Sequence, residues 1–187
     1  QFPEDVYENM GVAYHDTDIW QSPFGISHNI RAIRQIRRII RQEKIQVLHC
    51  HTPSGGLAAR LAALGTKAYV IYTAHGFHFY QGAGRIHNFI YHSVENFLSR
   101  MTDVIVTINH EDYRASKKMH EKKGSCLIPG VGLDREHFHE TTEKQRQKAR
   151  EKLGMDKKFF LLGVGELREN KNPIVIIEAL ALLKNSG

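Results

Sequence analysis

Long apolar runs are missing from this 187-residue sequence. The apolar runs that are present, such as residues 159–164, are far shorter than the ~20 residues that a membrane-spanning helix needs. No charged and then apolar leader of the kind found in signal peptides opens the chain. We therefore expect a cytoplasmic protein without a transmembrane segment.

Cysteine is scarce, with only Cys50 and Cys126, and no CxxC spacing occurs. Each cysteine lies in a predicted strand, which favours small buried side chains in a reducing compartment over a disulfide framework. The missing CxxC spacing also makes a structural zinc site unexpected.

Acidic residues are outnumbered, because 20 Asp and Glu face 26 Lys and Arg, for a formal charge of +6. This excess predicts an anionic partner, and nucleic acid, anionic lipid headgroups and sugar nucleotides all meet that description. The sequence contains no aromatic RNA-binding motif, zinc finger or recognition-helix pattern, so we expect no nucleic-acid partner.

Strand-like and helix-like patterns alternate after an irregular opening. Strands are predicted at residues 45–50, 69–73, 104–108 and 125–128. Helices are predicted at residues 28–42 and 85–100, one more is predicted to start at Thr52 and Pro53, and another is predicted to run from Asn109 to near Gly124. This alternation predicts an α/β fold, with a Rossmann-like parallel sheet that has helices on both faces.

A change in composition follows this first region. Residues 134–157 are polar and charged, with one helical stretch near 144–153, and residues 159–164 read as a new strand before a helix opened by Asn172 and Pro173. One strand and one helix cannot bury a core, so we expect the start of a second Rossmann-like domain. The predicted organisation is a first domain at 1–133, a connection at 134–157 and the second domain's first unit at 158–187. Both ends of the chain are expected to be cut.

Histidines and a glycine follow the second predicted strand. His75, Gly76 and His78 lie in residues 73–80. Ligands of open α/β sheets bind at the carboxyl ends of strands, so these residues are expected to face a cleft. An aromatic loop whose histidines only make structural hydrogen bonds is the alternative.

A second candidate site follows the strand predicted at 159–164. Gly165, Glu166, Lys171 and Asn172 lie between this strand and the next helix, whose first backbone amides and nearby lysine suit a diphosphate. An ordinary capped helix explains Asn172 equally well.

His49 and His51 form an HxH pair at the end of the first strand, a pattern that some metal-dependent hydrolases use to present two imidazoles to one ion. Because alternate side chains share a face of any strand, the pair is also explained by chance.

The arginine-rich helix at 28–42 is predicted to be a crossover whose isoleucine stripe packs against the sheet. As a secondary property, its arginines are expected to attract it to an anionic membrane surface.

Five segments together resemble the family-four retaining glycosyltransferases of bacterial capsule and exopolysaccharide synthesis. They are residues 48–56, 73–80, 97–113, 128–138 and 163–173. The resemblance implies the GT-B architecture, in which two Rossmann-like domains face each other across a cleft. It also implies that this chain lacks the family's first strand with its glycine-rich loop and most of its donor domain, so the fragment alone is expected to be inactive.

The resemblance further assigns roles to residues. His75 matches the catalytic histidine that approaches the transferred sugar, and Lys171 matches the basic residue on the donor diphosphate. Gly165, Glu166 and Asn172 fall at donor-binding positions, and Gly76, His51 and His78 fall on the acceptor side of the cleft. The family usually has arginine where this chain has Glu166, and Arg168 is the nearest replacement in the sequence.

The implied reaction moves a hexose from a nucleotide sugar to a lipid-linked or saccharide acceptor, with retention and without metal or cofactor, on the inner face of the plasma membrane. A non-hydrolysing sugar-nucleotide epimerase of the same architecture and a metal-dependent hydrolase built on His49 and His51 remain alternatives, as does a non-catalytic anion-binding module. The exposed edge of the last strand is expected to permit a dimer.

Overall fold

The computed structural model of the chain describes residues 4–20, 26–130, 132–155, 159–167 and 171–185. The chain divides into two compact units, Gln1–Gly132 and Leu133–Gly187, and each is described by itself.

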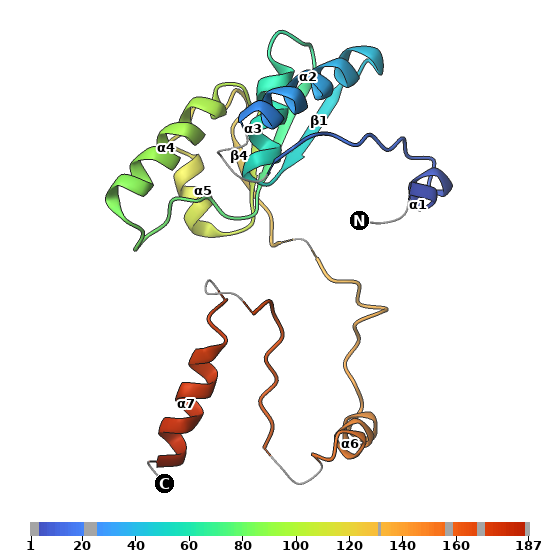
Figure 1. Cartoon of the computed structure of the whole chain (residues 1–187), viewed down its shortest axis with the longest axis vertical. Helices are drawn as coiled ribbons and strands as arrows, with labels where there is room; N and C mark the ends of the chain where they lie inside the picture. Colours follow the sequence, from blue (N-terminus) through green and yellow to red (C-terminus); the bar gives the residue numbers. More distant parts are fainter. Residues whose placement is uncertain (1–3, 21–25, 131, 156–158, 168–170, 186–187) are drawn as a thin grey trace. The chain divides into compact units, whose positions relative to one another are not determined.

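The first unit is built on a four-stranded parallel sheet in the order β1-β2-β3-β4 (Figure 1). Its elements are α1 (Glu4–Asn9), α2 (Ile26–Gln42), β1 (Val47–His51), α3 (Pro53–Ala63), β2 (Tyr69–Ala74), α4 (Arg85–Ser99), β3 (Val104–Thr107), α5 (His110–Ser116) and β4 (Ser125–Leu127). Each strand pairs with the next strand along the chain, so every connection between them is a crossover that contains a helix. The predicted α/β class and parallel sheet are confirmed.

The core lies between the sheet and helices α2 and α3. Cys50, Tyr72 and Ile105 project from one face of the sheet and are buried. The alanine-rich α3 contacts this face, and its small side chains allow a close approach. Ile40 of α2 joins the same cluster and Ile33 and Ile36 pack against it, which confirms this part of the predicted isoleucine stripe as a packing surface, whereas Ile30 is exposed.

Helix cover is uneven between the two faces of the sheet. Val47 and Tyr69, on the face opposite the core cluster, are exposed. Cys126 projects from the same face and is exposed as well, so the prediction that it is buried is wrong. The error arises because alternation along a strand does not say whether a helix covers a particular face.

Two helices differ from their predicted extents. The opening segment forms the short helix α1 instead of irregular chain. Helix α5 ends at Ser116, well before the predicted end near Gly124. It ends early because the amides of Lys122 and Lys123 donate to the carbonyls of Thr102 and Asp103 at the start of β3, which requires extended chain there.

The second unit contains α6 (Glu143–Lys152) and α7 (Ile174–Asn185). A capping box between Thr142 and Gln145 starts α6, which confirms the predicted helix in this region. The strand predicted at residues 159–164 does not form in the part of the chain that the structure describes. A strand exists only through hydrogen bonds to a neighbouring strand, and the described residues of this unit include none.

Candidate active site

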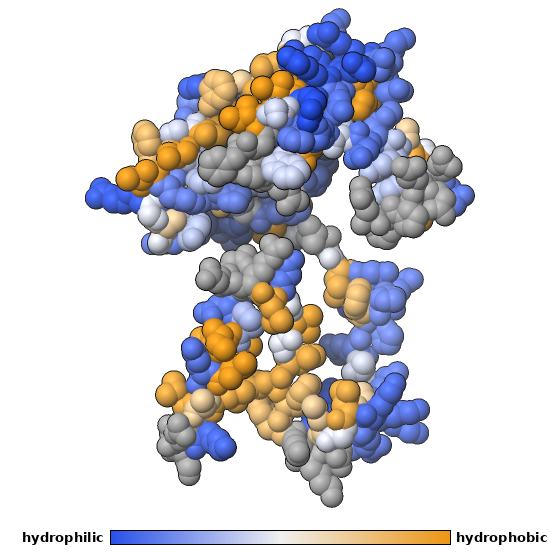
Figure 2. All heavy atoms as spheres, viewed as in Figure 1, coloured by the Kyte–Doolittle hydropathy of each residue, from blue (hydrophilic) through white to orange (hydrophobic). Residues whose placement is uncertain are grey.

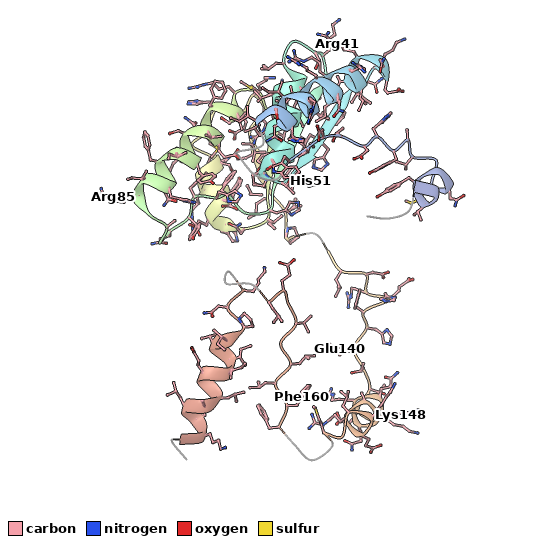
Figure 3. The ribbon with its side chains drawn as sticks, in the orientation of Figure 1. Arg41, His51, Arg85, Glu140, Lys148 and Phe160 are labelled. Carbon is pink, nitrogen blue, oxygen red and sulfur yellow. The ribbon has the colours of Figure 1, made fainter. Side chains whose placement is uncertain are left out.

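The candidate active site centres on two histidines at the carboxyl edge of the sheet. His51 is the last residue of β1, where Figure 3 labels it, and His75 directly follows β2. The parallel register pairs His51 with Thr73, which brings the two imidazoles together. His51 Nδ1 lies 3.0 Å from His75 Nε2, a hydrogen-bond distance. The structure thus joins a predicted catalytic residue to a predicted cleft residue.

His49 continues this row of imidazoles. Its Nε2 lies 2.8 Å from Oγ1 of Thr73, and its ring centroid lies 4.3 Å from that of His51. Among the described residues, no group of three or more His, Cys, Asp or Glu side chains is placed to hold a metal ion. The HxH pair is engaged with a hydroxyl and a third imidazole, and within the described part of the chain no carboxylate completes a ligand set with it.

The surroundings of His51 favour the neutral form of its imidazole over the protonated form. Partial burial is the main cause that lowers the pKa of His51 below 6.5, and the neighbouring His49 and His75 add to it, since a positive charge on either ring opposes a second one. A neutral imidazole has one donor and one acceptor nitrogen. If His51 donates through Nδ1, Nε2 of His75 accepts, and Nδ1 of His75 then carries the proton that can be donated to a ligand.

The chain between this pair and helix α3 is strained. Thr52 has φ of 61° and ψ of 154°, a backbone conformation that a β-branched residue rarely adopts. Its hydroxyl caps α3 by accepting from the amide of Gly55 at 3.3 Å. Strain of this kind is concentrated at functional sites, where surrounding structure holds it in place.

A cavity of about 300 Å³ opens at this helix terminus and is lined by Thr52, Pro53, Ser54 and His78. The ring of His78 stacks on Tyr91 of α4 with centroids 5.1 Å apart. The structure therefore places His78 at the N-terminus of α3, as a wall of this cavity.

The loop that carries these histidines is anchored from α5. The amide of Phe77 donates to Oδ2 of Asp112 at 3.2 Å, and Asn109 donates to the same oxygen at 2.7 Å. Burial raises the pKa of Asp112, although both hydrogen bonds act in the opposite direction. Phe77 is itself buried, while Gly76 before it has φ of 146°, a conformation that favours glycine. Gly76 turns the chain between His75 and the anchored Phe77, and its place on the acceptor side of the cleft stays a prediction.

A larger cavity of about 550 Å³ was not predicted from the sequence. It lies between the loop that follows Phe79, the first two turns of α4 and helix α5, and its walls include Arg85, Phe89, His92 and Glu111. These residues come from three separate segments, so only the tertiary structure brings them together. The aromatic residues at 79 and 80 were the only signal for it in the sequence.

The predicted donor residues all belong to the other unit. Gly165, Glu166, Lys171 and Asn172 are exposed. Asn172 has φ of 42°, a left-handed conformation, whereas the N-cap that the sequence predicts is normally extended, and α7 begins only at Ile174. Arg168 lies outside the described residues.

Comparisons with known proteins concern the family and the fold of the chain. The family model described as Glycosyl transferase 4-like matches residues 4–109. The candidate glycosyltransferase EpsD of Bacillus subtilis (strain 168) is 42% identical over 173 residues, covering 89% of this chain and 45% of EpsD. The crystal structure of Anabaena Alr3699/HepE in complex with UDP and glucose has a TM-score of 0.68 at 14% identity, covering 96% of this chain and 47% of that one.

The chain thus spans less than half the length of either relative. At 14% identity the structural likeness concerns the fold, and it agrees with the Rossmann-like α/β architecture predicted from the sequence. No helix among the described residues is both long and apolar enough to cross a membrane.

Proposed function

The chain belongs to the Glycosyl transferase 4-like family, and from this premise we propose that it carries the acceptor-side site of a retaining hexosyltransferase. The single observation that carries the proposal is the hydrogen-bonded pair of His51 and His75 at the carboxyl edge of the parallel sheet. This edge is where open α/β folds bind their ligands.

In the proposed reaction His75 is the catalytic residue. It donates a hydrogen bond to the sugar while His51 keeps its ring in one orientation and one tautomer. No covalent nucleophile is required, because front-face displacement of the diphosphate accounts for retention.

Lys171, together with the backbone at Gly165, Glu166 and Asn172, is proposed to hold the nucleotide sugar. The leaving diphosphate gains negative charge in the transition state, and a lysine beside a helix N-terminus stabilises that charge without a metal ion. Glu166 opposes this effect, so the proposed clamp depends on Lys171.

The proposed acceptor is lipid-linked or saccharide, in synthesis of a cell-surface polysaccharide such as capsule or exopolysaccharide, with the enzyme on the inner face of the plasma membrane. HepE was crystallised with UDP and glucose, which makes UDP-glucose the first donor to try. Because the chain spans less than half of its relatives, the activity is proposed for the gene product that contains it, and the chain alone is proposed to be inactive.

Transfer of radiolabelled sugar tests the proposal. The gene product is incubated with a panel of nucleotide sugars and a membrane lipid extract, and new glycosides are separated from the donor. We expect His75→Ala to lower the rate by roughly 10²-fold or more, which is the scale of a lost acid, base or hydrogen-bonding group in catalysis. We expect Lys171→Ala to weaken donor binding.

His120→Ala is the matched control, because His120 is an exposed histidine that follows α5, away from the histidine row. It should retain normal transfer. Equal transfer by His75→Ala and His120→Ala contradicts the assignment of His75. An isomerised sugar nucleotide in place of a glycoside identifies an epimerase instead.

A further inference from the structure

Helix α4 carries an apolar stripe on its outer surface. Its members are exposed by 40% to 79%, and they are Ile86, Phe89, Ile90, Val94 and Phe97. Their spacing of three or four residues places them along one side of the helix. Figure 2 shows them as a continuous orange band over α4.

The opposite side of α4 already makes the contacts that hold the helix in the fold. Leu98 and Ser99 are buried there, and Glu95 forms a buried ion pair with Arg60 of α3. The stripe is therefore additional to the core, and it is more apolar than a solvated helix face requires.

The exposed charges at the two ends of α4 are positive. Its only carboxylate, Glu95, is neutralised by Arg60 at 2.9 Å. Exposed Arg85 begins the helix, as Figure 3 shows, and exposed Arg100 directly follows it. An apolar stripe that ends in arginines and contains no free acid is complementary to anionic headgroups above acyl chains.

We propose that α4 docks on an anionic phospholipid bilayer, with the apolar stripe in the acyl boundary and Arg85 and Arg100 at the phosphates. The inference rests on the proposed function only in that a lipid-linked acceptor brings the enzyme to a membrane. The contact with that membrane is then made by α4.

The arginine-rich helix α2, which the sequence favours for membrane attraction, is less suited to this role. Ile33, Ile36 and Ile40 pack on the core, and Ile26 and Ile30 near its start are its exposed isoleucines. Arg37 donates to the carbonyls of Leu61 and Ala62 at the end of α3, and Arg31 pairs with Asp18 at 2.7 Å. Helix α2 thus offers charge with only a short exposed apolar surface at its start, whereas the apolar stripe of α4 runs along the helix between two exposed arginines.

Vesicle flotation tests the proposal with the 187-residue chain. The vesicles are phosphatidylcholine alone or phosphatidylcholine with phosphatidylglycerol, and no donor is present. We expect binding to the anionic vesicles, reduced roughly tenfold or more by Ile86→Gln combined with Ile90→Gln, since interfacial binding scales with buried apolar area.

Two control variants separate α4 from the other candidate surfaces. Ile177→Gln with Leu183→Gln removes comparably exposed apolar side chains from α7, and Arg34→Gln with Arg38→Gln removes exposed charge from α2. Both controls should bind more tightly than the α4 variant. Binding that is lost in either control and kept in the α4 variant overturns the proposal.

A spectroscopic reporter keeps the test independent of folding defects. Phe89→Trp, in a Trp20→Phe background, places the chain's only tryptophan in the stripe. We expect its emission to shift to the blue with anionic vesicles and to be quenched by brominated acyl chains. Emission that does not respond to vesicles overturns the proposal, as does a blue shift that appears with rising protein concentration without vesicles, which would show the stripe buried between two copies.

The two proposals can fail separately. Vesicle binding without any glycosyl transfer removes the proposed function and keeps the docking surface. Transfer to a lipid-linked acceptor with no effect of the α4 variant on vesicle binding removes the docking surface and keeps the function.

Discussion

His51 lies at the exposed edge of the sheet, yet its surroundings oppose the protonated imidazolium. Its Nδ1 lies 3.0 Å from another imidazole, and no carboxylate among the described residues joins the pair to balance a positive charge. A histidine that stays neutral near physiological pH can keep one tautomer and orient its partner. This property is what the proposed role of His51 requires.

The titration of His51 can be followed by NMR through its imidazole signals. We expect a pKa below 6.5, caused first by partial burial and then by His49 and His75, and we expect His75→Gln to raise it. The folded state then binds fewer protons than the unfolded state. The corresponding stability is therefore fully present above pH 6.5 and is lost as the pH falls through the lowered pKa.

His110→Gln is a suitable comparison for this titration, because His110 is an exposed histidine that starts α5 and is not a member of the row. It should leave the pKa of His51 unchanged. A value at or above 6.5 in the unmodified protein, or one that does not respond to His75→Gln, contradicts the described electrostatics.

At the scale of elements, helices α3 and α4 are joined by a buried ion pair. Arg60 is fully buried and Glu95 is 7% exposed, and both guanidinium nitrogens of the fork contact the carboxylate. Arg60 also lies over the ring of Tyr72, 4.0 Å from its centroid, and burial raises the pKa of that phenol. This pair holds in place the helix that carries both the wall of the larger cavity and the apolar stripe.

Removing one partner of this pair leaves the other charge buried and unpaired. We expect Arg60→Met alone to lower the free energy of unfolding by about 3–5 kcal/mol, and the double variant Arg60→Met with Glu95→Met to lower it less. Urea denaturation followed by circular dichroism measures both. If the double variant has a lower free energy of unfolding than Arg60→Met, the unpaired charge of Glu95 is not the main cost of the single substitution, and this explanation is wrong.

Arg146→Ala provides the control, because it breaks the pair between Arg146 and Glu143 on α6. The two groups lie 3.3 Å apart, and their side chains are 60% and 80% exposed. An exposed pair of this kind contributes about 0–1 kcal/mol, so the change should be small. Equal losses for Arg60→Met and Arg146→Ala contradict the burial of the α3–α4 pair.

At the scale of the whole molecule, the two units differ in how well they bury their apolar side chains. The first unit has a continuous core, whereas Phe159, Val164 and Leu167 of the second are each about nine-tenths exposed. The described residues at 159–165 also make no backbone hydrogen bond to one another or to other described residues. The apolar sequence that predicts a strand therefore has no partner strand in the described part of the chain.

Hydrogen exchange followed by mass spectrometry can detect this difference. We expect amides of β2 and β3 to be strongly protected, and those at 159–167 to exchange near the rate of unfolded chain, because local stability follows hydrogen bonding and burial. Protection at 159–167 that equals that of β2 contradicts this expectation. Protection that rises with protein concentration indicates the predicted pairing of this edge with a second copy.

Much of the first unit could be predicted from local patterns. The isoleucine spacing of α2, the Thr52 and Pro53 start of α3 and the Asn109 cap of α5 are short-range features, and each is found where the sequence places it. The position of His51 and His75 at the sheet edge follows from the same patterns, because every parallel strand ends at that edge.

Other features depend on residues that are distant in the sequence. The contact between His51 and His75 depends on the register of β1 against β2, and the larger cavity depends on three segments that meet. Helix α5 ends early because of hydrogen bonds to the start of β3. No periodicity in the sequence encodes these distances.

The sequence by itself determined the alternation of strands and helices, the parallel sheet and the placement of histidines at its carboxyl edge, because periodicity and capping act over a few neighbouring residues. Only the tertiary structure decided which apolar surfaces are covered. It packed Ile33, Ile36 and Ile40 of α2 on the core, left the stripe of α4 exposed and, in the described part of the chain, formed no strand at residues 159–164. The physical reason is that burial and strand pairing are properties of two surfaces that meet, and a single segment specifies only one of them.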